Sequence, residues 1–347
     1  MKKYFCFLLS LIKNFFFSNK IFYVIEYVKW ANYNDAINLK KFFKKKLIIT
    51  NEIHGIKNSI IHVGTHYKLF DKKKFKNVDQ SNKLIVFWPH FDRKNYISSF
   101  LKKNISKIYK INTCSLNTKI ELIKFGIPKR KISHTPLSFD KKIFYNIKEK
   151  KKMELKEKYS IPKDKLILGS FVKDGVGFEK GNIAKKIKNP QMLIKSLKKS
   201  KYKQDLFLVL SGPARGYLKN ELKKLNINYF HKNCFSPKEL AELYRLVDIT
   251  IINSNLEGGP YSLLESLASG VPVISTKVGM ATEVIKNNYN GYLLKINDHK
   301  SLSIKINQLI KNREKIKSLK INTIKSVKPY SIENIGAKYY KKIYELN

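Results

Sequence analysis

The sequence predicts an α/β protein with two domains, each built on a parallel sheet that helices cover. Its 347 residues exceed the roughly 250–300 residues at which a single hydrophobic core stops growing. From residue 21 onward, short apolar runs alternate with helical stretches, which is the pattern of strand–helix–strand units. Hydrophobic residues make up 43% of the chain and aromatic residues 12%, enough for packed cores, which excludes a disordered polycation.

The first domain is expected over residues 21–148, after an N-terminal segment at 1–20. Its apolar runs predict strands within 21–28, 45–50, 59–64, 83–89 and 107–114. Residues 127–146 are irregular and punctuated by proline, as expected for the approach to a linker between domains.

The second domain is expected over residues 149–330. After a basic helix at 149–159, strands are predicted within 166–172, 205–212, 227–230, 248–254 and 271–275, with helices at 189–200, 215–225 and 236–247. Ser236 and Glu239 fit a capping box at the start of the last of these helices. Residues 331–347 form a final helix, for which Ser331 is the expected N-cap.

Neither the net charge nor the cysteine content points to a particular binding partner. The net charge is +44, but lysine occurs in every segment, as an AT-rich coding sequence would produce without selection for charge, so we expect no nucleic-acid partner. Cys6, Cys114 and Cys234 are far apart and form no C-x-x-C pair, which indicates neither a disulfide framework nor a zinc site. A cytoplasmic protein is therefore expected.

The first twenty residues are apolar with basic punctuation. Their longest uncharged run, Tyr4 to Ile12, is shorter than the roughly 20 residues of a spanning helix, and no small-x-small signal-peptide cleavage site follows. Lys3, Ser10 and Asn14 fall on one side of a helical wheel. This pattern favours a helix in the membrane interface, in peripheral contact with the anionic inner face of the cytoplasmic membrane. The alternatives are a signal peptide and a helix packed on its own domain.

Residues 251–270 carry the pattern with the most chemical content. A strand ends near Asn253, Gly258 and Gly259 permit a tight turn, and Pro260 suits the first position of a helix that stops at Gly270. The free amides at the start of that helix favour an anion such as a diphosphate.

Glu257 and Glu265 flank this anion site. Carboxylates beside an anion site are useful when they accept hydrogen bonds from hydroxyl groups, such as those of a sugar and a ribose. The pattern therefore predicts a site for a sugar nucleotide.

Residues 257–285, EGGPYSLLESLASGVPVISTKVGMATEVI, closely resemble the Glu, seven residues, Glu signature of glycosyltransferase family 4, including its downstream Gly279 and Glu283. The resemblance implies the GT-B fold: two Rossmann-like domains facing across a cleft, with the C-terminal helix crossing back to the first domain. It also implies retaining transfer of a hexose from a UDP- or GDP-sugar. In that family the second glutamate holds the ribose, the first helps hold the donor sugar, and amides of the loop hold the diphosphate. Carried over, these roles fall on Glu265, Glu257 and the loop residues Gly258, Gly259, Pro260, Tyr261 and Ser262.

The resemblance assigns further residues to the donor diphosphate. GSFVKDGVG and IKNP resemble the paired basic positions that neutralise it, which gives Lys173 and Lys188. The family's usual arginine is not clearly present at the first position, and Asn189 replaces the glycine expected after Lys188.

On the acceptor side, His90 in FWPHF corresponds to a family histidine close to the reacting sugar, and His66 is the alternative. The family's glycine-rich loop after the first strand is missing, because residues 27–35 are YVKWANYND. The resemblance implies a glycan or lipid-linked acceptor, in surface polysaccharide or lipopolysaccharide synthesis.

No Asp-x-Asp motif, which metal-dependent glycosyltransferases use, occurs in the chain. We therefore expect no metal and no other cofactor, with lysines and a helix N-terminus stabilising the leaving group. The alternatives are an inactive GT-B scaffold that binds a glycan or nucleotide, and a nucleic-acid or anionic-surface binder driven by the net charge of +44.

Overall fold

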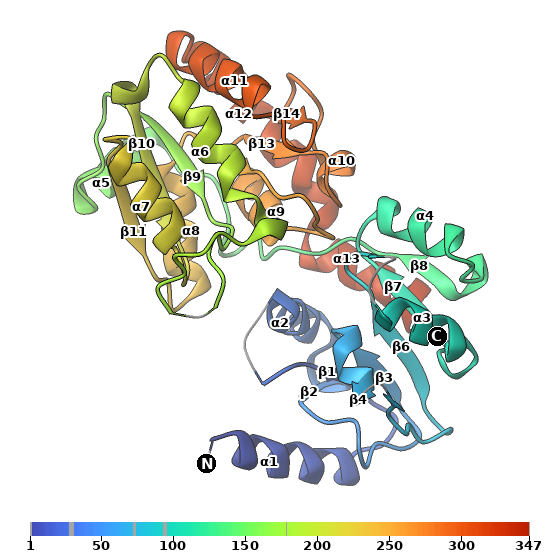
Figure 1. The fold of residues 1–347 in the computed structure, drawn as a ribbon. Coiled ribbons are helices and arrows are strands. Elements are labelled where there is room, and N and C mark those ends of the chain that lie inside the picture. The colour runs from blue at the N-terminus through green and yellow to red at the C-terminus, as the bar shows by residue number, and fades with distance from the viewer. Residues whose placement is uncertain (1, 28–30, 72–73, 93–95, 178, 347) are drawn as a thin grey trace. The chain divides into compact units, whose positions relative to one another are not determined.

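A computed structural model of the chain describes residues 2–27, 31–71, 74–92, 96–177 and 179–346. The chain divides into two compact units: unit 1 contains Met1–Ser138 and Tyr330–Asn347, and unit 2 contains Phe139–Pro329 (Figure 1). The division lies before residue 139, whereas we expected the first domain to extend to 148. Residues between 139 and 148 belong to unit 2, because the Arg245 guanidinium donates hydrogen bonds to the carbonyls of Ile143 (2.7 Å) and Tyr145 (3.1 Å).

Unit 1 contains a six-stranded sheet in which every neighbouring pair is parallel, in the order β2-β1-β3-β6-β7-β8. Its strands are β1 (Ile21–Val24), β2 (Leu47–Thr50), β3 (Ile60–Val63), β6 (Lys83–Phe87), β7 (Lys110–Thr113) and β8 (Ile132–His134), and a small ladder joins β4 (Phe70–Asp71) to β5 (Lys74–Phe75). The five predicted strands are confirmed. β8 was not predicted, because three residues just before Pro136 carry too short an apolar signal.

Helices cover both faces of this sheet (Figure 1). They are α2 (Ala31–Phe43), α3 (Tyr96–Lys103), α4 (Leu116–Lys124) and α13 (Ile332–Lys338), whereas α1 (Lys2–Phe16) packs on the loop that follows β2. Along β1, Phe22 and Val24 enter one core, whereas Ile21 and Tyr23 enter the core on the opposite face. Because successive side chains of a strand point to opposite faces, a strand buried on both sides appears as a continuous apolar run.

The C-terminal segment returns to unit 1, as the resemblance implied. The predicted cap is confirmed, because the Ser331 hydroxyl accepts a hydrogen bond from the Asn334 amide at 3.3 Å. After α13 the chain continues as a π-helical turn, Tyr339–Ile343. The Tyr344 hydroxyl lies 2.8 Å from Nδ1 of buried His62, so polar as well as apolar contacts fix the segment.

His66 gives unit 1 a specific sensitivity to acid. It is buried, stacks on Trp88 with ring centroids 4.2 Å apart, and its pKa is lowered to about 3, chiefly by burial. A histidine with a depressed folded pKa contributes full stability above its unfolded pKa of about 6.5 and loses it as the pH falls toward the folded value. Between pH 7 and pH 5, His66 should therefore cost the wild type about 2 kcal/mol of unfolding free energy.

Urea unfolding of the wild type and of His66→Phe, which keeps an aromatic ring against Trp88, measures this contribution. The difference between the two proteins should change by that amount, in favour of the variant, as the pH falls from 7 to 5. Equal pH dependence of the two proteins would show that folding does not lower the pKa of His66.

Unit 2 contains the second six-stranded parallel sheet, in the order β11-β10-β9-β12-β13-β14. Its strands are β9 (Leu166–Ser170), β10 (Leu206–Ser211), β11 (Tyr229–Lys232), β12 (Ile249–Ile252), β13 (Val273–Thr276) and β14 (Gly291–Leu294). The five predicted strands are confirmed, and β14 was not predicted. Numbered along the chain, this is the Rossmann order 3-2-1-4-5-6, which reverses direction between β9 and β12.

Eight helices are described in unit 2: α5 (Glu149–Lys158), α6 (Pro190–Lys199), α7 (Gly216–Lys224), α8 (Pro237–Leu246), α9 (Tyr261–Ala268), α10 (Ala281–Val284), α11 (His299–Lys311) and α12 (Glu314–Val327). The predicted capping box of Ser236 and Glu239 is confirmed. Pro260 is the N-cap of α9, with extended backbone, and not its first helical residue. The predicted stop at Gly270 is confirmed, because this residue has the left-handed φ of +79° that suits glycine after a helix.

Candidate functional site

The donor-site residues predicted in the second domain follow the carboxyl ends of neighbouring strands in unit 2. Lys173 lies in the loop after β9, and Glu257 lies in the loop after β12. These two strands flank the point where the strand order reverses, so their connections leave in opposite directions. In open parallel sheets such a point forms a crevice in which ligands bind.

Lys188 and Glu257 meet as an ion pair in this region, although 69 residues separate them in the sequence. Both side chains are largely buried, and the Ser254 hydroxyl donates a second hydrogen bond to the Glu257 carboxylate at 2.9 Å. The pair places the Lys188 ammonium group and the Glu257 carboxylate side by side. This arrangement suits a ligand that has both an anionic group and hydroxyl groups.

The structure explains why asparagine is tolerated after Lys188. Asn189 has a φ of +48°, in the left-handed region that glycine adopts freely and that asparagine tolerates better than other residues. The Asn253 amide donates hydrogen bonds to the carbonyls of Lys188 (2.9 Å) and Asn189 (2.6 Å). The turn that presents Lys188 is thus tied to the end of β12.

The start of α9 is closely packed and polar. Gly258, Gly259, Pro260, Tyr261 and Ser262 form the turn into the helix. The Ser262 hydroxyl is buried and has no hydrogen-bond partner among the residues that the structure describes. A buried hydroxyl without a partner at a helix N-terminus is suited to donate to an anion placed there.

Gly279 supports this turn from the following loop. The Met280 amide donates to the Gly258 carbonyl at 2.8 Å, and Gly279 has a φ of +45°. A Cβ atom added at Gly279 would lie 1.9 Å from the Gly258 oxygen and 2.6 Å from the Glu257 oxygen. The close approach of the two loops therefore requires glycine at position 279.

Glu265 is buried in α9, and the Tyr244 hydroxyl in α8 donates a hydrogen bond to its carboxylate at 2.9 Å. Burial raises the pKa of Glu265 to about 7, while the hydrogen bond from Tyr244 acts in the opposite direction. Sequence reasoning missed Tyr244, because nothing local indicates a contact across 21 residues. The one sequence signal is an amphipathic helix whose apolar side includes a tyrosine.

Tyr244→Phe tests this hydrogen bond. Without it, the ionised carboxylate loses a donor, so the pKa of Glu265 should rise further above its ordinary value. Carbon-13 NMR of labelled glutamate would measure this shift. Phe171→Leu is the control, since that ring packs on Tyr244 with centroids 4.1 Å apart and forms no part of the hydrogen bond. An unchanged Glu265 pKa in Tyr244→Phe would contradict the assignment.

Lys173 lies half-buried after β9, and burial lowers its pKa. Its neighbour Asp174 forms a buried ion pair with Arg215, at 2.6 Å between Oδ1 and Nε. Arg215 also donates to the carbonyl of Ser170 at 2.9 Å. This arginine, which sequence reasoning missed, ties the loop that carries Lys173 to the end of β9.

His90, predicted on the acceptor side, belongs to unit 1, whereas the residues described above belong to unit 2. It is half-buried after β6 and close enough to His66 to contribute to the lowered pKa of that residue. Within the segment 27–35, which lacks the expected glycines, residues 28–30 lie outside the described residues.

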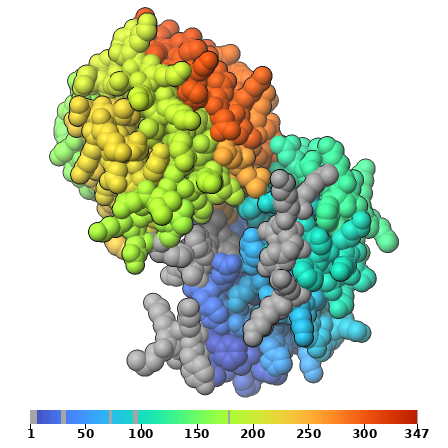
Figure 2. Space-filling model, in the orientation of Figure 1, coloured from blue at the N-terminus to red at the C-terminus, as the bar shows by residue number. Residues whose placement is uncertain are grey.

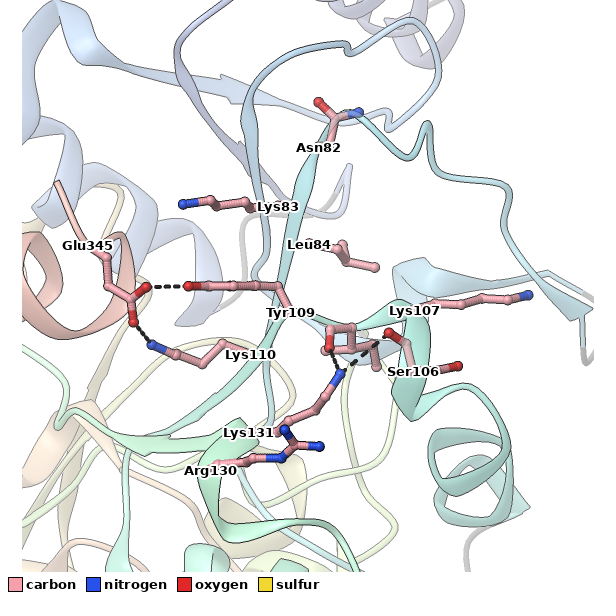
Figure 3. A pocket seen from close by; sticks show the side chains of 11 residues that line it. Asn82, Lys83, Leu84, Ser106, Lys107, Tyr109, Lys110, Arg130, Lys131 and Glu345 are labelled. Atoms are coloured by element: carbon pink, nitrogen blue, oxygen red, sulfur yellow. Dashed lines mark hydrogen bonds and ion pairs between the residues drawn. The ribbon is translucent and has the colours of Figure 1, made fainter.

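A separate hollow of about 490 Å³ lies at the amino ends of β6 and β7 in unit 1 (Figure 3). Two of its lysines have partners: Lys110 pairs with Glu345, and Lys131 donates to the carbonyl of Ile105 at 2.7 Å. The Lys110–Glu345 pair joins this edge of the sheet to the C-terminal segment.

Across the described residues, no group of three or more His, Cys, Asp or Glu side chains could hold a metal ion. In the same part of the chain, no helix has the length and apolar character needed to cross a membrane.

Comparison with known proteins shows relatives among sugar-transferring enzymes. Residues 160–326 match the family model of Glycosyl transferases group 1. The chain is 26% identical to N-acetyl-alpha-D-glucosaminyl L-malate synthase of Bacillus anthracis over 285 residues, 72% of this chain and 71% of the relative. It is 33% identical over 107 residues to N,N'-diacetylbacillosaminyl-diphospho-undecaprenol alpha-1,3-N-acetylgalactosaminyltransferase of Campylobacter jejuni, which is 31% of this chain and 28% of that one.

Among solved structures, Anabaena HepE in complex with UDP-glucose superposes with a TM-score of 0.76 at 14% identity, covering 94% of this chain and all of HepE. This likeness concerns the fold. The chain thus resembles Glycosyl transferases group 1 over residues 160–326, and as a whole it has the two-domain α/β fold known as GT-B.

Proposed function

We propose that the chain is a retaining glycosyltransferase of family 4, which transfers a hexose from a nucleoside-diphosphate sugar to a hydroxyl group of a glycan or lipid-linked acceptor. The observation that carries the proposal is the constellation at the ends of β9 and β12. There, the Lys188–Glu257 pair, the start of α9 and buried Glu265 belong to one compact unit.

The donor diphosphate would bind at the start of α9. The free amides there and the unpartnered Ser262 hydroxyl would donate to its oxygens, and Lys188, with Lys173, would supply positive charge. These groups would stabilise the nucleoside diphosphate as negative charge develops on it in the transition state. Their charge supports a reaction that needs no divalent metal.

The two glutamates would hold the hydroxyl groups of the donor. Glu265, steadied by Tyr244, would accept hydrogen bonds from the ribose, and Glu257, steadied by Ser254, from the sugar. During transfer the bond between the anomeric carbon and the diphosphate oxygen breaks, and the acceptor oxygen bonds on the same face. Attack on that face brings the acceptor hydroxyl beside the departing phosphate oxygen. The phosphate oxygen can then take the proton of the acceptor hydroxyl.

The comparisons support the choice of substrates. HepE is a protein of the same fold whose structure contains UDP-glucose, and the name of the Campylobacter relative includes a lipid diphosphate acceptor. We therefore propose a UDP- or GDP-sugar as donor. His90 is proposed to act near the acceptor.

The test is a calorimetric screen of the purified protein against UDP-, GDP- and ADP-sugars, followed by a slow-hydrolysis assay with and without EDTA. We expect one donor to bind with micromolar affinity and to be hydrolysed at an equal rate in EDTA. Binding without hydrolysis or transfer would show that the scaffold is inactive, and no binding by any donor would refute the proposal.

A further inference from the structure

Helix α1 packs on unit 1 through a side that contains two buried polar residues, Ser10 and Asn14, alongside the half-buried Phe7 and Leu11. Asn14 is only 1% exposed, and its amide donates hydrogen bonds to the carbonyls of Glu52 (3.0 Å) and His54 (2.8 Å). The buried Ser10 hydroxyl accepts a hydrogen bond from the Asn51 amide at 3.1 Å. Two contacts one helical turn apart therefore fix both the position and the rotation of the helix.

The opposite side of α1, which is also apolar, is left exposed, with Phe15 at its edge beside His54. Ile12 is 53% exposed, Phe15 64% and Phe16 80%, and Phe17 follows the helix, also exposed. Leu8 and Leu9 extend the same exposed set toward the N-terminus. In Figure 2 the dark-blue atoms of α1 lie at the surface of unit 1. Single exposed apolar residues are normal, but a set gathered on one helix marks an interaction surface.

Lysines border this apolar surface. Lys13 is exposed on α1, and Lys44, Lys45 and Lys46 are exposed in the turn between α2 and β2, where Lys46 lines the same hollow as Lys20, just after α1. Lys13 and Lys20 lie close enough to Lys40 for their charges, after burial, to lower its pKa. The surface thus combines apolar side chains with a concentrated positive field.

The apolar side chains and the lysines together indicate which partner would cover the exposed side of α1. A second copy of the chain would bring another basic rim against this one, and the net charge of +44 makes that approach unfavourable. An anionic bilayer complements both parts, since acyl chains accept the phenylalanines while phosphate headgroups attract the lysines. Because Ser10 and Asn14 hold the opposite side of the helix against protein, α1 would lie flat on the bilayer surface.

We propose that α1 is a preoriented membrane-docking element, which unit 1 holds with its exposed apolar side outward for peripheral binding to bilayers rich in anionic phospholipid. The proposal does not depend on the proposed enzymatic function.

Vesicle co-sedimentation of the full chain tests this docking. Vesicles of phosphatidylcholine with phosphatidylglycerol should bind the wild type, and vesicles of phosphatidylcholine alone should bind it much more weakly. Ile12→Ser with Phe16→Ser removes two exposed side chains from one side of α1 and should lower the partition coefficient by about tenfold or more. The matched control is Ile183→Ser with Phe235→Ser, which removes the same two residue types from exposed positions in unit 2 and should bind as the wild type does.

A charge pair provides a second readout that leaves α1 unchanged. Lys44→Gln with Lys45→Gln should weaken binding and reduce its salt dependence, whereas Lys198→Gln with Lys199→Gln, exposed on α6, should have little effect. The proposal is overturned if the wild type does not sediment with anionic vesicles, or if the α1 variant and its control bind equally. It is also overturned if light scattering shows a dimer in solution that Ile12→Ser with Phe16→Ser converts to monomer, because the occupant is then a second copy. Unchanged thermal unfolding of each variant verifies its fold.

Discussion

Glu265→Ala is expected to weaken binding of the donor nucleotide sugar by about a hundredfold at pH 8. On the proposed function, the ionised carboxylate accepts two hydrogen bonds from the ribose. Each hydrogen bond to a charged group is worth about 1.5 kcal/mol, and about 1.4 kcal/mol corresponds to a factor of ten in affinity. Calorimetric titration with the donor found in the screen measures the loss.

The raised pKa of Glu265 adds a pH dependence to this prediction. With a pKa of about 7, the carboxyl is mostly protonated at pH 6 and mostly ionised at pH 8. If the ionised form binds ribose, wild-type affinity should rise about tenfold over that range. A nucleotide sugar is the right ligand, because its diphosphate is esterified at both ends and has no second phosphate ionisation in this range.

Glu265→Gln is the matched control, because it keeps the shape of the side chain and cannot ionise. Its affinity should be low and independent of pH between 6 and 8. A carboxyl with a raised folded pKa contributes stability that is complete below its unfolded pKa of about 4.5 and is lost as the pH rises through 7. The glutamine variant should therefore be at least as stable as the wild type at pH 8. Equal affinities for the two proteins at that pH would remove Glu265 from the proposed ribose site.

Gly279→Ala is expected to lower the free energy of unfolding of unit 2 by about 3 kcal/mol or more and to abolish measurable donor binding. The added methyl group would lie 1.9 Å from the Gly258 oxygen, a backbone atom that cannot rotate away, and the backbone at 279 has a φ of +45°. Relief of the overlap requires the two loops to separate. That movement breaks the Met280–Gly258 hydrogen bond and displaces the start of α9.

Gly212→Ala is the control that separates the backbone strain of a positive φ from the steric overlap of the added methyl group. Gly212 also has a positive φ, +91°, but a Cβ atom there meets nothing within 4 Å. This variant should cost only about 1–2 kcal/mol, the strain alone, and should still bind the donor. Urea unfolding and calorimetry on both variants measure the difference, and equal losses would refute the requirement for close approach.

The strands and caps of unit 2 could be predicted because their signals are local. A strand buried on both faces is a continuous apolar run, and β9, β10 and β12 each have one. The cap formed by Ser236 and Glu239 depends on residues three apart. By contrast, β8 has only three residues and β14 begins with Gly291, so their formation depends on pairing with β7 and β13.

The candidate site likewise has residues that the sequence predicted and contacts that it did not. Spacing along one loop and helix was enough to single out Glu257, Gly258 and Glu265. The contacts that hold them were not predictable, because Tyr244 lies on another helix and Lys188 on another loop. Burial, which raises the pKa of Glu265, is likewise a property of the packed unit.

By itself the sequence determined the two parallel-sheet domains, the loop and helix that carry the glutamates, and the amphipathic character of the N-terminal segment. Only the tertiary structure decided which side of α1 faces outward, why Asn189 is accepted after Lys188, and which partners hold the glutamates. The physical reason is that periodicity, capping and turn chemistry act over a few residues. Burial, left-handed backbone and ion pairing depend on groups that folding brings together from distant parts of the chain.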